Sequence, residues 1–154
     1  MHIVFAASEC VPFAKTGGLA DVVGALPPEL ARLGHRVAVY LPLYRSARAL
    51  LTEPLAYTAR SITIPFPSYN RFAGIVDGGL RNGVQYYFVD CPELFDRDGI
   101  YGPKSGAGDY PDNAERFGLF CRAVLEAAKL LGVPEIFHAH DWTTALLPIL
   151  LRTT

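Results

Sequence analysis

Two buried strands joined by a helix within the first 41 residues constrain the fold more than any other feature of this sequence. Residues 3–7 are continuously apolar, as expected of a strand covered on both faces, and residues 36–41 (RVAVYL) have the same character. A loop and a helical stretch, residues 19–34, lie between them. Strand, loop, helix and strand in this order form a βαβ unit, which predicts a parallel sheet and an α/β fold.

The helix of this unit contains two adjacent prolines, Pro27 and Pro28. A proline inside a helix removes a backbone hydrogen bond. We therefore expect one helix that ends near Leu26 and a second helical piece that runs to about Leu33, with Gly34 as the stop.

The middle of the chain predicts antiparallel strands. Residues 62–64 alternate in polarity, and residues 72–76 and 84–89 flank two turn signals, Asp77-Gly78-Gly79 and Asn82-Gly83. We expect a small β-hairpin excursion here.

Residues 96–111 are rich in glycine and aspartate and predict a loop that is long for a compact domain. Loops of this length are either functional or mobile. Four glycines and few apolar side chains leave little surface to hold it, so we expect it to be the most mobile part of the domain.

Residues 112–131 form the clearest predicted helix, because their apolar side chains recur along one stripe. Asp112 or Asn113 can cap its start, and Gly132 suits its end.

A further short strand is expected at residues 135–140, and Asp141 is a good N-cap for a last helix, residues 142–151. We find no internal repeat and no linker, so the chain reads as one domain.

Composition excludes several classes of protein. Hydrophobic residues make up 51% of the chain and charged residues 19%, which excludes a disordered protein. The formal net charge is −1 and the basic residues are scattered, so we expect no nucleic-acid partner. The apolar N-terminal run is too short for a signal peptide or a membrane span, so we expect no membrane partner. Three cysteines without a C-x-x-C pair favour free thiols and a cytoplasmic location.

The segment from Lys15 to Asp21 (KTGGLAD) lies between a strand and a helix, where open α/β sheets bind phosphate. Adjacent glycines let a ligand approach the backbone and leave amides free, and Lys15 supplies a positive charge. The segment is neither a Walker A loop nor G-x-G-x-x-G. Anion binding and a plain glycine-rich turn therefore both remain open, and Asp21 on spacing alone is an ordinary acid of a first helical turn.

The segment HAHDW, residues 138–142, ends a predicted strand. His138 and His140 share a face because side chains alternate along a strand. No third ligand stands at a useful spacing, so we expect no metal. His138 reads as a core histidine, and His140 is expected at the carboxyl end of a central parallel strand, nearer the crevice where ligands bind.

Asp112 stands at the start of the predicted helix 112–131. A helix cap is the simpler interpretation of this carboxylate, and a place at the mouth of a ligand site is the functional one.

Three stretches together resemble one family. Residues 8–27 (SE, then P, then KTGGLADVVGALP) are similar to the N-terminal signature of bacterial glycogen synthases and plant starch synthases. Residues 138–142 match a second signature, and Asp112-Asn113 followed by Arg116-Phe117 match a third. The three span nearly the whole chain in the family's order.

The resemblance implies a GT-B glycosyltransferase, with two Rossmann-like domains and an active site in the cleft between them. This chain would be the N-terminal one, a Rossmann-like parallel sheet flanked by helices. The reaction would move glucose from ADP-glucose to the non-reducing end of an α-1,4-glucan, with retention and without a metal or other cofactor. Independently of the resemblance, Tyr101 and Tyr110 of the 96–111 loop are aromatic side chains that could stack on glucan rings when the acceptor binds.

The resemblance also implies roles for single residues. Lys15 and the Gly17-Gly18 backbone would approach the donor diphosphate. Asp21, Asp112 and His140 would line the sugar and acceptor region, with His140 holding glucose hydroxyls and orienting the developing oxocarbenium ion.

The chain stops where family members continue. We therefore expect residues 1–154 to form a single, incomplete N-terminal domain, inactive alone, with the second, nucleotide-binding domain absent. The C-terminal domain of the same enzyme would be its partner. The alternative is a non-catalytic module that binds glucan or phosphate. Another GT-B family, such as sucrose or trehalose-phosphate synthases, fits the KTGGLADV stretch less well.

Overall fold

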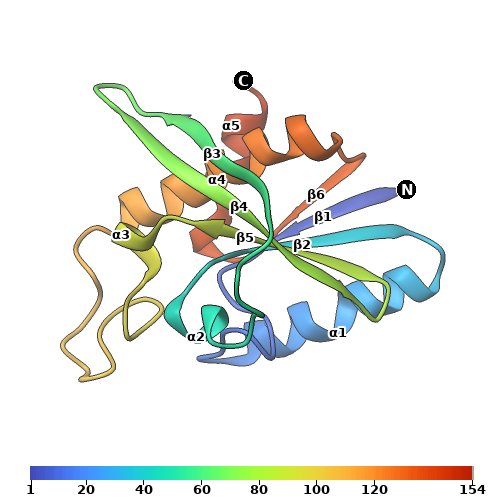
Figure 1. The fold of residues 1–154 in the computed structure, drawn as a ribbon, viewed down its shortest axis with the longest axis horizontal. Coiled ribbons are helices and arrows are strands. Elements are labelled where there is room, and N and C mark those ends of the chain that lie inside the picture. Colours follow the sequence, from blue (N-terminus) through green and yellow to red (C-terminus); the bar gives the residue numbers. More distant parts are fainter. Residues whose placement is uncertain (154) are drawn as a thin grey trace.

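A computed structural model describes residues 1–153 and shows a single six-stranded sheet between helices (Figure 1). The strands lie in the order β3-β4-β5-β2-β1-β6. The parallel core consists of β1 (His2–Ala6), β2 (Arg36–Pro42), β5 (Val84–Asp90) and β6 (Ile136–Ala139). At the other side of β5, β4 (Asn70–Arg81) and β3 (Tyr57–Pro65) extend the sheet with antiparallel pairing. The predicted α/β fold with a parallel sheet is confirmed.

Helices α1 (Gly18–Arg32) and α4 (Asn113–Leu131) lie on opposite sides of the sheet (Figure 1). Alternate residues of β1 enter two separate cores, because Val4 and Ala6 pack on the α4 side while Ile3 and Phe5 pack on the α1 side. This double burial explains why the strand is continuously apolar. The remaining helices are short: α2 (Arg45–Arg48), α3 (Pro92–Phe95), the 3-10 helix η1 (Trp142–Thr144) and α5 (Leu147–Leu151).

Helix α1 runs without a break through Pro27 and Pro28, so the expectation of two helical pieces is wrong. Ala20, Val23 and Pro27 are its buried residues, and they follow one stripe at helical spacing. A continuous helix keeps this stripe against the sheet, and tertiary packing of this kind outweighs the hydrogen bonds that the prolines remove.

The expected β-hairpin is present as β4 and β5, and both of its strands belong to the main sheet. Its turn lies at Asn82 and Gly83, which have φ angles of 50° and 78°, as a two-residue hairpin turn requires. The other predicted turn, Asp77-Gly78-Gly79, is instead a bulge within β4, where the register shifts between Asp77 and Gly79.

The loop of residues 96–111 is held more firmly than its composition predicts. Arg116, fully buried in α4, donates to the carbonyl oxygens of Leu94 (2.7 Å) and Ile100 (2.8 Å). A Cβ on Gly99 would lie 1.9 Å from the oxygen of Gly102, so this glycine permits close backbone packing. Mobility of the loop stays a prediction, but the reason given for it, that little holds the loop, is wrong.

The C-terminal segment forms η1 and α5 instead of one helix over residues 142–151. The expected cap is present, because the Asp141 carboxylate accepts a hydrogen bond from the amide of Trp142 at 2.7 Å. Among residues 1–153, strand β6 pairs only with β1 and forms an edge of the sheet, so its expected central position is wrong for this part of the chain. Within residues 1–153, no helix has the length and apolar character needed to cross a membrane.

We predict that Gly24→Ala destabilises the domain by about 1–3 kcal/mol, although alanine is the better helix former. A Cβ at position 24 would lie 2.3 Å from Cγ2 of Val11, a branched side chain with little rotational freedom. Denaturant unfolding measures the change. In a Val11→Ala background the same substitution is expected to be neutral or stabilising, and stabilisation in the wild-type background would contradict the packing argument.

Candidate functional site

Two of the three sequence motifs meet at the carboxyl ends of two neighbouring parallel strands. The chain leaves β1 at Ala6 and continues through Ser8 and Glu9 toward the glycine loop. Next to it, β6 ends at Ala139, and the amide of His140 donates to the Ala6 carbonyl at 3.2 Å. This edge of a parallel sheet is where α/β proteins bind ligands.

Glu9 organises the glycine loop from within. It is only 3% exposed, and its carboxylate accepts hydrogen bonds from the amides of Thr16 (2.5 Å) and Gly17 (3.1 Å). The Thr16 hydroxyl (2.7 Å) and the Tyr101 hydroxyl (2.6 Å) donate to the same carboxylate. These donors satisfy a charge that would be costly to bury alone.

The protonation of Glu9 follows from these contacts. Burial by itself raises the pKa of the carboxyl, but the hydrogen bonds from Thr16, Tyr101 and Gly17 outweigh it and hold the pKa below its ordinary value. The group is therefore a carboxylate at neutral pH.

Gly17 and Gly18 face open space. A Cβ on either residue would meet no atom within 4 Å, and neither has a positive φ angle. The Gly17 amide is not free, because Glu9 accepts its hydrogen bond, so that part of the expectation is wrong. Gly18 begins α1, and the first turn of a helix leaves amides without intrahelical acceptors.

Lys15 and Asp21 form an exposed ion pair beside the glycines. The Lys15 Nζ atom lies 2.7 Å from Oδ1 and 2.8 Å from Oδ2 of Asp21. Their side chains are 51% and 57% exposed, so the pair is worth little to stability and can open. Both charges can therefore turn to a ligand.

Tyr101 joins the far loop to this edge. Its hydroxyl contacts the Ser8 hydroxyl (2.8 Å) as well as Glu9, and Thr143 donates to Ser8 at 3.1 Å. The Asn113 side chain donates to the Tyr101 carbonyl at 2.8 Å. Tyr101 is therefore anchored inside the domain through its hydroxyl and its carbonyl, and stacking of its ring on a sugar stays a prediction.

Asp112 reaches the site from the α4 side. Asp112 stands at the N-cap position of α4, but its side chain accepts no hydrogen bond from the amides of the first turn. The prediction that its carboxylate caps the helix is therefore wrong. Instead, Arg97 binds both carboxylate oxygens, at 2.8 and 2.5 Å. The hydrogen bond from Arg97 is the main reason that the pKa of Asp112 is lowered.

Tyr110 has two cationic neighbours in the folded domain. The guanidinium groups of Arg97 and Arg116 lie 4.7 Å and 4.9 Å from the centre of its ring. The ring therefore packs against Arg97 of the loop and Arg116 of α4, and its stacking on a sugar stays a prediction.

His140 lies in a stack of three rings on the α1 side of the sheet. Its ring centre is 4.5 Å from that of His138 and 5.5 Å from that of Phe5. Its Nε2 atom is buried and has no hydrogen-bond partner in residues 1–153. Burial, followed by the nearby His138, lowers the pKa of His140, so the ring is neutral at pH 7.

A cavity of about 810 Å³ opens between the glycine loop and the 96–111 loop. Lys15 and Thr16 line one wall, and Arg97, Tyr101 and Lys104 line another. The fully buried Tyr44 also lines it, and its hydroxyl has no partner in the described chain. The lining of the cavity is mainly apolar, with several polar and charged groups, and the cavity is large enough for a sugar-sized ligand.

The structure thus joins the glycine loop to Tyr101 through Glu9, and His140 follows the end of the adjacent strand. Asp112 pairs with Arg97, whose side chain lines the same cavity as Lys15. Sequence reasoning missed Arg97 and the organising role of Glu9, because their partners are remote in sequence. No group of three or more metal-ligating side chains is found in residues 1–153.

The sequence matches the family described as starch synthase catalytic domain over residues 2–154. Over 153 residues, 99% of this chain, it is 64% identical to a glycogen synthase of Koribacter versatilis (strain Ellin345), and 45% identical to a glycogen synthase of Bacillus subtilis (strain 168). These matches cover 31% and 30% of the two relatives, so the chain spans about a third of their length.

One solved structure is similar in both fold and sequence. It is the catalytic domain of starch synthase IV from Arabidopsis thaliana bound to ADP and acarbose, with a TM-score of 0.77 and 32% identity. The match covers 95% of this chain and 29% of that one.

We predict that Glu9→Gln lowers the free energy of unfolding by about 1.5–3 kcal/mol at neutral pH, because the amide cannot satisfy the same donors. The native pKa of Glu9 is lowered, so its contribution is complete above the ordinary carboxyl pKa and is lost as the pH falls through the native pKa. Unfolding measured from pH 7 to pH 3 is therefore expected to bring variant and wild type together in acid. Glu29→Gln, at an exposed carboxylate, is the matched control, and parallel pH profiles for Glu9→Gln and wild type would contradict the assignment.

Proposed function

Because this chain belongs to the starch synthase catalytic domain family, we propose that the protein containing it is a retaining glucosyltransferase. It transfers glucose from ADP-glucose to the non-reducing end of an α-1,4-glucan, without a metal. The chain supplies the N-terminal part, and the remaining two thirds of the relatives' length would supply the nucleotide-binding domain. The ADP and acarbose bound to the similar starch synthase support this choice of donor and acceptor.

The open space at Gly17 and Gly18 is the observation that supports the proposal best. Neither the backbone conformation nor the packing of the described chain requires a glycine there. The missing side chains instead leave room for a ligand to reach the first turn of α1, where amides and the helix dipole favour an anion. The diphosphate of a sugar nucleotide fits this position.

Lys15 completes the anion site by exchanging partners. Its ammonium group leaves the exposed pair with Asp21 and turns to the diphosphate, where it stabilises the charge that grows on the leaving ADP. Asp21 is then free to accept a hydroxyl of the sugar. Since the Gly17 amide is held by Glu9, the amide contact to the ligand falls to Gly18.

His140 and Asp112 serve the sugar. A neutral imidazole can hydrogen-bond a glucose hydroxyl without placing a positive charge beside a developing oxocarbenium ion, and the lowered pKa of His140 keeps it neutral. Asp112, held ionised by Arg97, stabilises that positive charge from the other side of the site.

The experiment is an assay of the full-length protein with labelled ADP-glucose or UDP-glucose and glycogen, with and without EDTA. We expect incorporation from ADP-glucose that EDTA does not reduce, and complete release of the added glucose by an α-1,4-specific exo-hydrolase. Glucan or phosphate binding without any transfer would instead support a non-catalytic module.

We predict that His140→Ala abolishes most glucosyl transfer and leaves stability nearly unchanged, whereas Asp141→Ala costs about 1 kcal/mol of stability through the lost cap and keeps most activity. The two neighbours differ because only Asp141 caps η1. Initial rates of glucosyl transfer and thermal unfolding of both variants measure the effects on activity and on stability separately. Wild-type turnover in His140→Ala would contradict the role given to this ring.

We also predict that Gly18→Ala raises the donor KM about tenfold or more, the effect of one lost contact of about 1.4 kcal/mol. Its stability is expected to stay the same or rise by up to about 1 kcal/mol, because the new Cβ meets no atom of the chain. Steady-state kinetics and unfolding on the same preparation test both parts. An unchanged donor KM, or a loss of stability, would contradict the proposal that Gly18 is needed for ligand binding and not for folding.

A further inference from the structure

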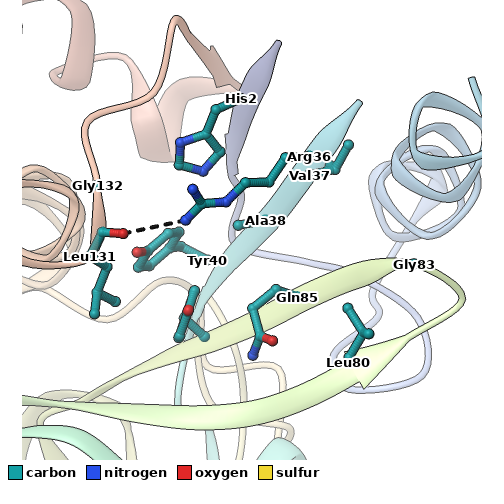
Figure 2. Close-up of a pocket in the computed structure, with 11 residues that line it drawn as sticks. His2, Arg36, Val37, Ala38, Tyr40, Leu80, Gly83, Gln85, Leu131 and Gly132 are labelled. Atoms are coloured by element: carbon teal, nitrogen blue, oxygen red, sulfur yellow. Dashed lines mark hydrogen bonds between the residues drawn. The ribbon is translucent and has the colours of Figure 1, made fainter. Parts of the chain in front are cut away.

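A second pocket lies at the opposite end of the sheet from the glycine loop (Figure 2). Its walls come from the first residues of the parallel strands, with His2 on β1 and Arg36 on β2, and from the last turn of α4 at Leu131. The cavity has a volume of about 270 Å³. None of its lining residues belongs to the proposed donor or acceptor site.

Arg36 contributes a positive charge that no carboxylate in residues 1–153 neutralises by an ion pair. Figure 2 shows its side chain extending across the pocket toward the carbonyl oxygen of Leu131, to which it donates at 3.4 Å. A guanidinium group has five N–H donors. One long hydrogen bond therefore leaves most of them available.

Two phenol hydroxyls lie in the same pocket without a partner. Tyr40 is 2% exposed and Tyr87 is half-buried, and neither hydroxyl is hydrogen-bonded within the described chain. Their rings pack against each other with centres 5.0 Å apart. Burial raises the pKa of both phenols, and the positive charge of Arg36 opposes the rise.

The nearby carboxylates are occupied by other donors. The Asp77 Oδ1 atom accepts from the side-chain amide of Gln85 (2.6 Å) and from the amide of Gly79 (2.8 Å). Glu135 accepts from the backbone amide of His2. Burial and the charge of Arg36 lower the pKa of His2, which is therefore neutral at pH 7. Among the residues that line the pocket, Arg36 is the charged side chain, and it is accompanied by the two phenol hydroxyls that can donate hydrogen bonds.

We propose that the pocket of Arg36, Tyr40 and Tyr87 is a separate binding site for a compact oxyanion, the phosphate group of free phosphate or of a small phosphorylated metabolite. The guanidinium group and the two hydroxyls supply hydrogen-bond donors from three side chains that line one cavity, and a phosphate oxyanion accepts several such bonds. A water molecule occupies about 30 Å³, so the cavity has room for the oxyanion and a further small substituent.

The test is calorimetric titration of the full-length protein with inorganic phosphate and with a hexose monophosphate, at constant ionic strength and with saturating ADP to fill the proposed donor site. We expect saturable binding of one ion per chain, with a Kd of about 1 mM. Arg36→Gln is expected to weaken it about tenfold or more, and Tyr87→Phe about threefold. Tighter binding of the hexose monophosphate would identify a metabolite as the source of the phosphate, and equal binding would identify the free ion.

Two variants serve as controls. Arg32→Gln removes an exposed arginine that is paired with Glu29, and Lys15→Gln removes the cation of the glycine loop. Neither is expected to change phosphate affinity. Wild-type affinity in a folded Arg36→Gln protein, or no saturation at tens of millimolar phosphate, would overturn the proposal. If only Lys15→Gln lost phosphate binding, the ion would bind at the glycine loop. That result would refute the site at Arg36 and would leave the proposed function unaffected.

Discussion

The buried carboxylate of Glu9 is the interaction on which the arrangement of the site depends. A charge removed from water is tolerated only when hydrogen bonds replace its hydration, and here the replacement comes from the glycine loop and from Tyr101. Strand β1 ends at Ala6, and the fully buried Ala7 and Ser8 connect it to Glu9, so the charge is anchored to the rigid centre of the sheet. The loop and the far segment are thus positioned relative to β1 by one group.

A buried cation plays the corresponding part on the α4 side. Arg116 is fully buried, has no carboxylate partner in the described chain, and binds backbone carbonyls of the segment that leads to Tyr101. Aromatic rings of Phe95, Tyr110 and Phe117 surround its guanidinium group. Two separate buried charges therefore shape the two walls of the large cavity, and Tyr101 lies where their networks meet.

Local sequence patterns predicted the parts of the fold that local physics decides. The apolar runs of β1 and β2 predict strands that are buried on both faces. The Asn82-Gly83 pair predicts a turn whose backbone adopts positive φ angles. The path of α1 through Pro27 was not predictable in this way, because the sheet beneath the helix decides it. The partner of Asp112 was missed for a related reason, since nothing in the sequence marks Arg97 as its neighbour in space. Motifs identified the residues that gather at the site, and the contacts that hold them there emerged only from the fold.

The bare glycines of the loop have a consequence for protein engineering. Gly17 and Gly18 owe nothing to the packing of the chain around them, so folding exerts no pressure to retain them. A directed-evolution experiment that selects only for thermal stability or expression would accept larger residues at both positions, because neither property would fall. Mutant libraries of this domain would therefore need these two codons fixed, or a second selection for ligand binding. Otherwise they would accumulate stable variants that no longer bind the ligand.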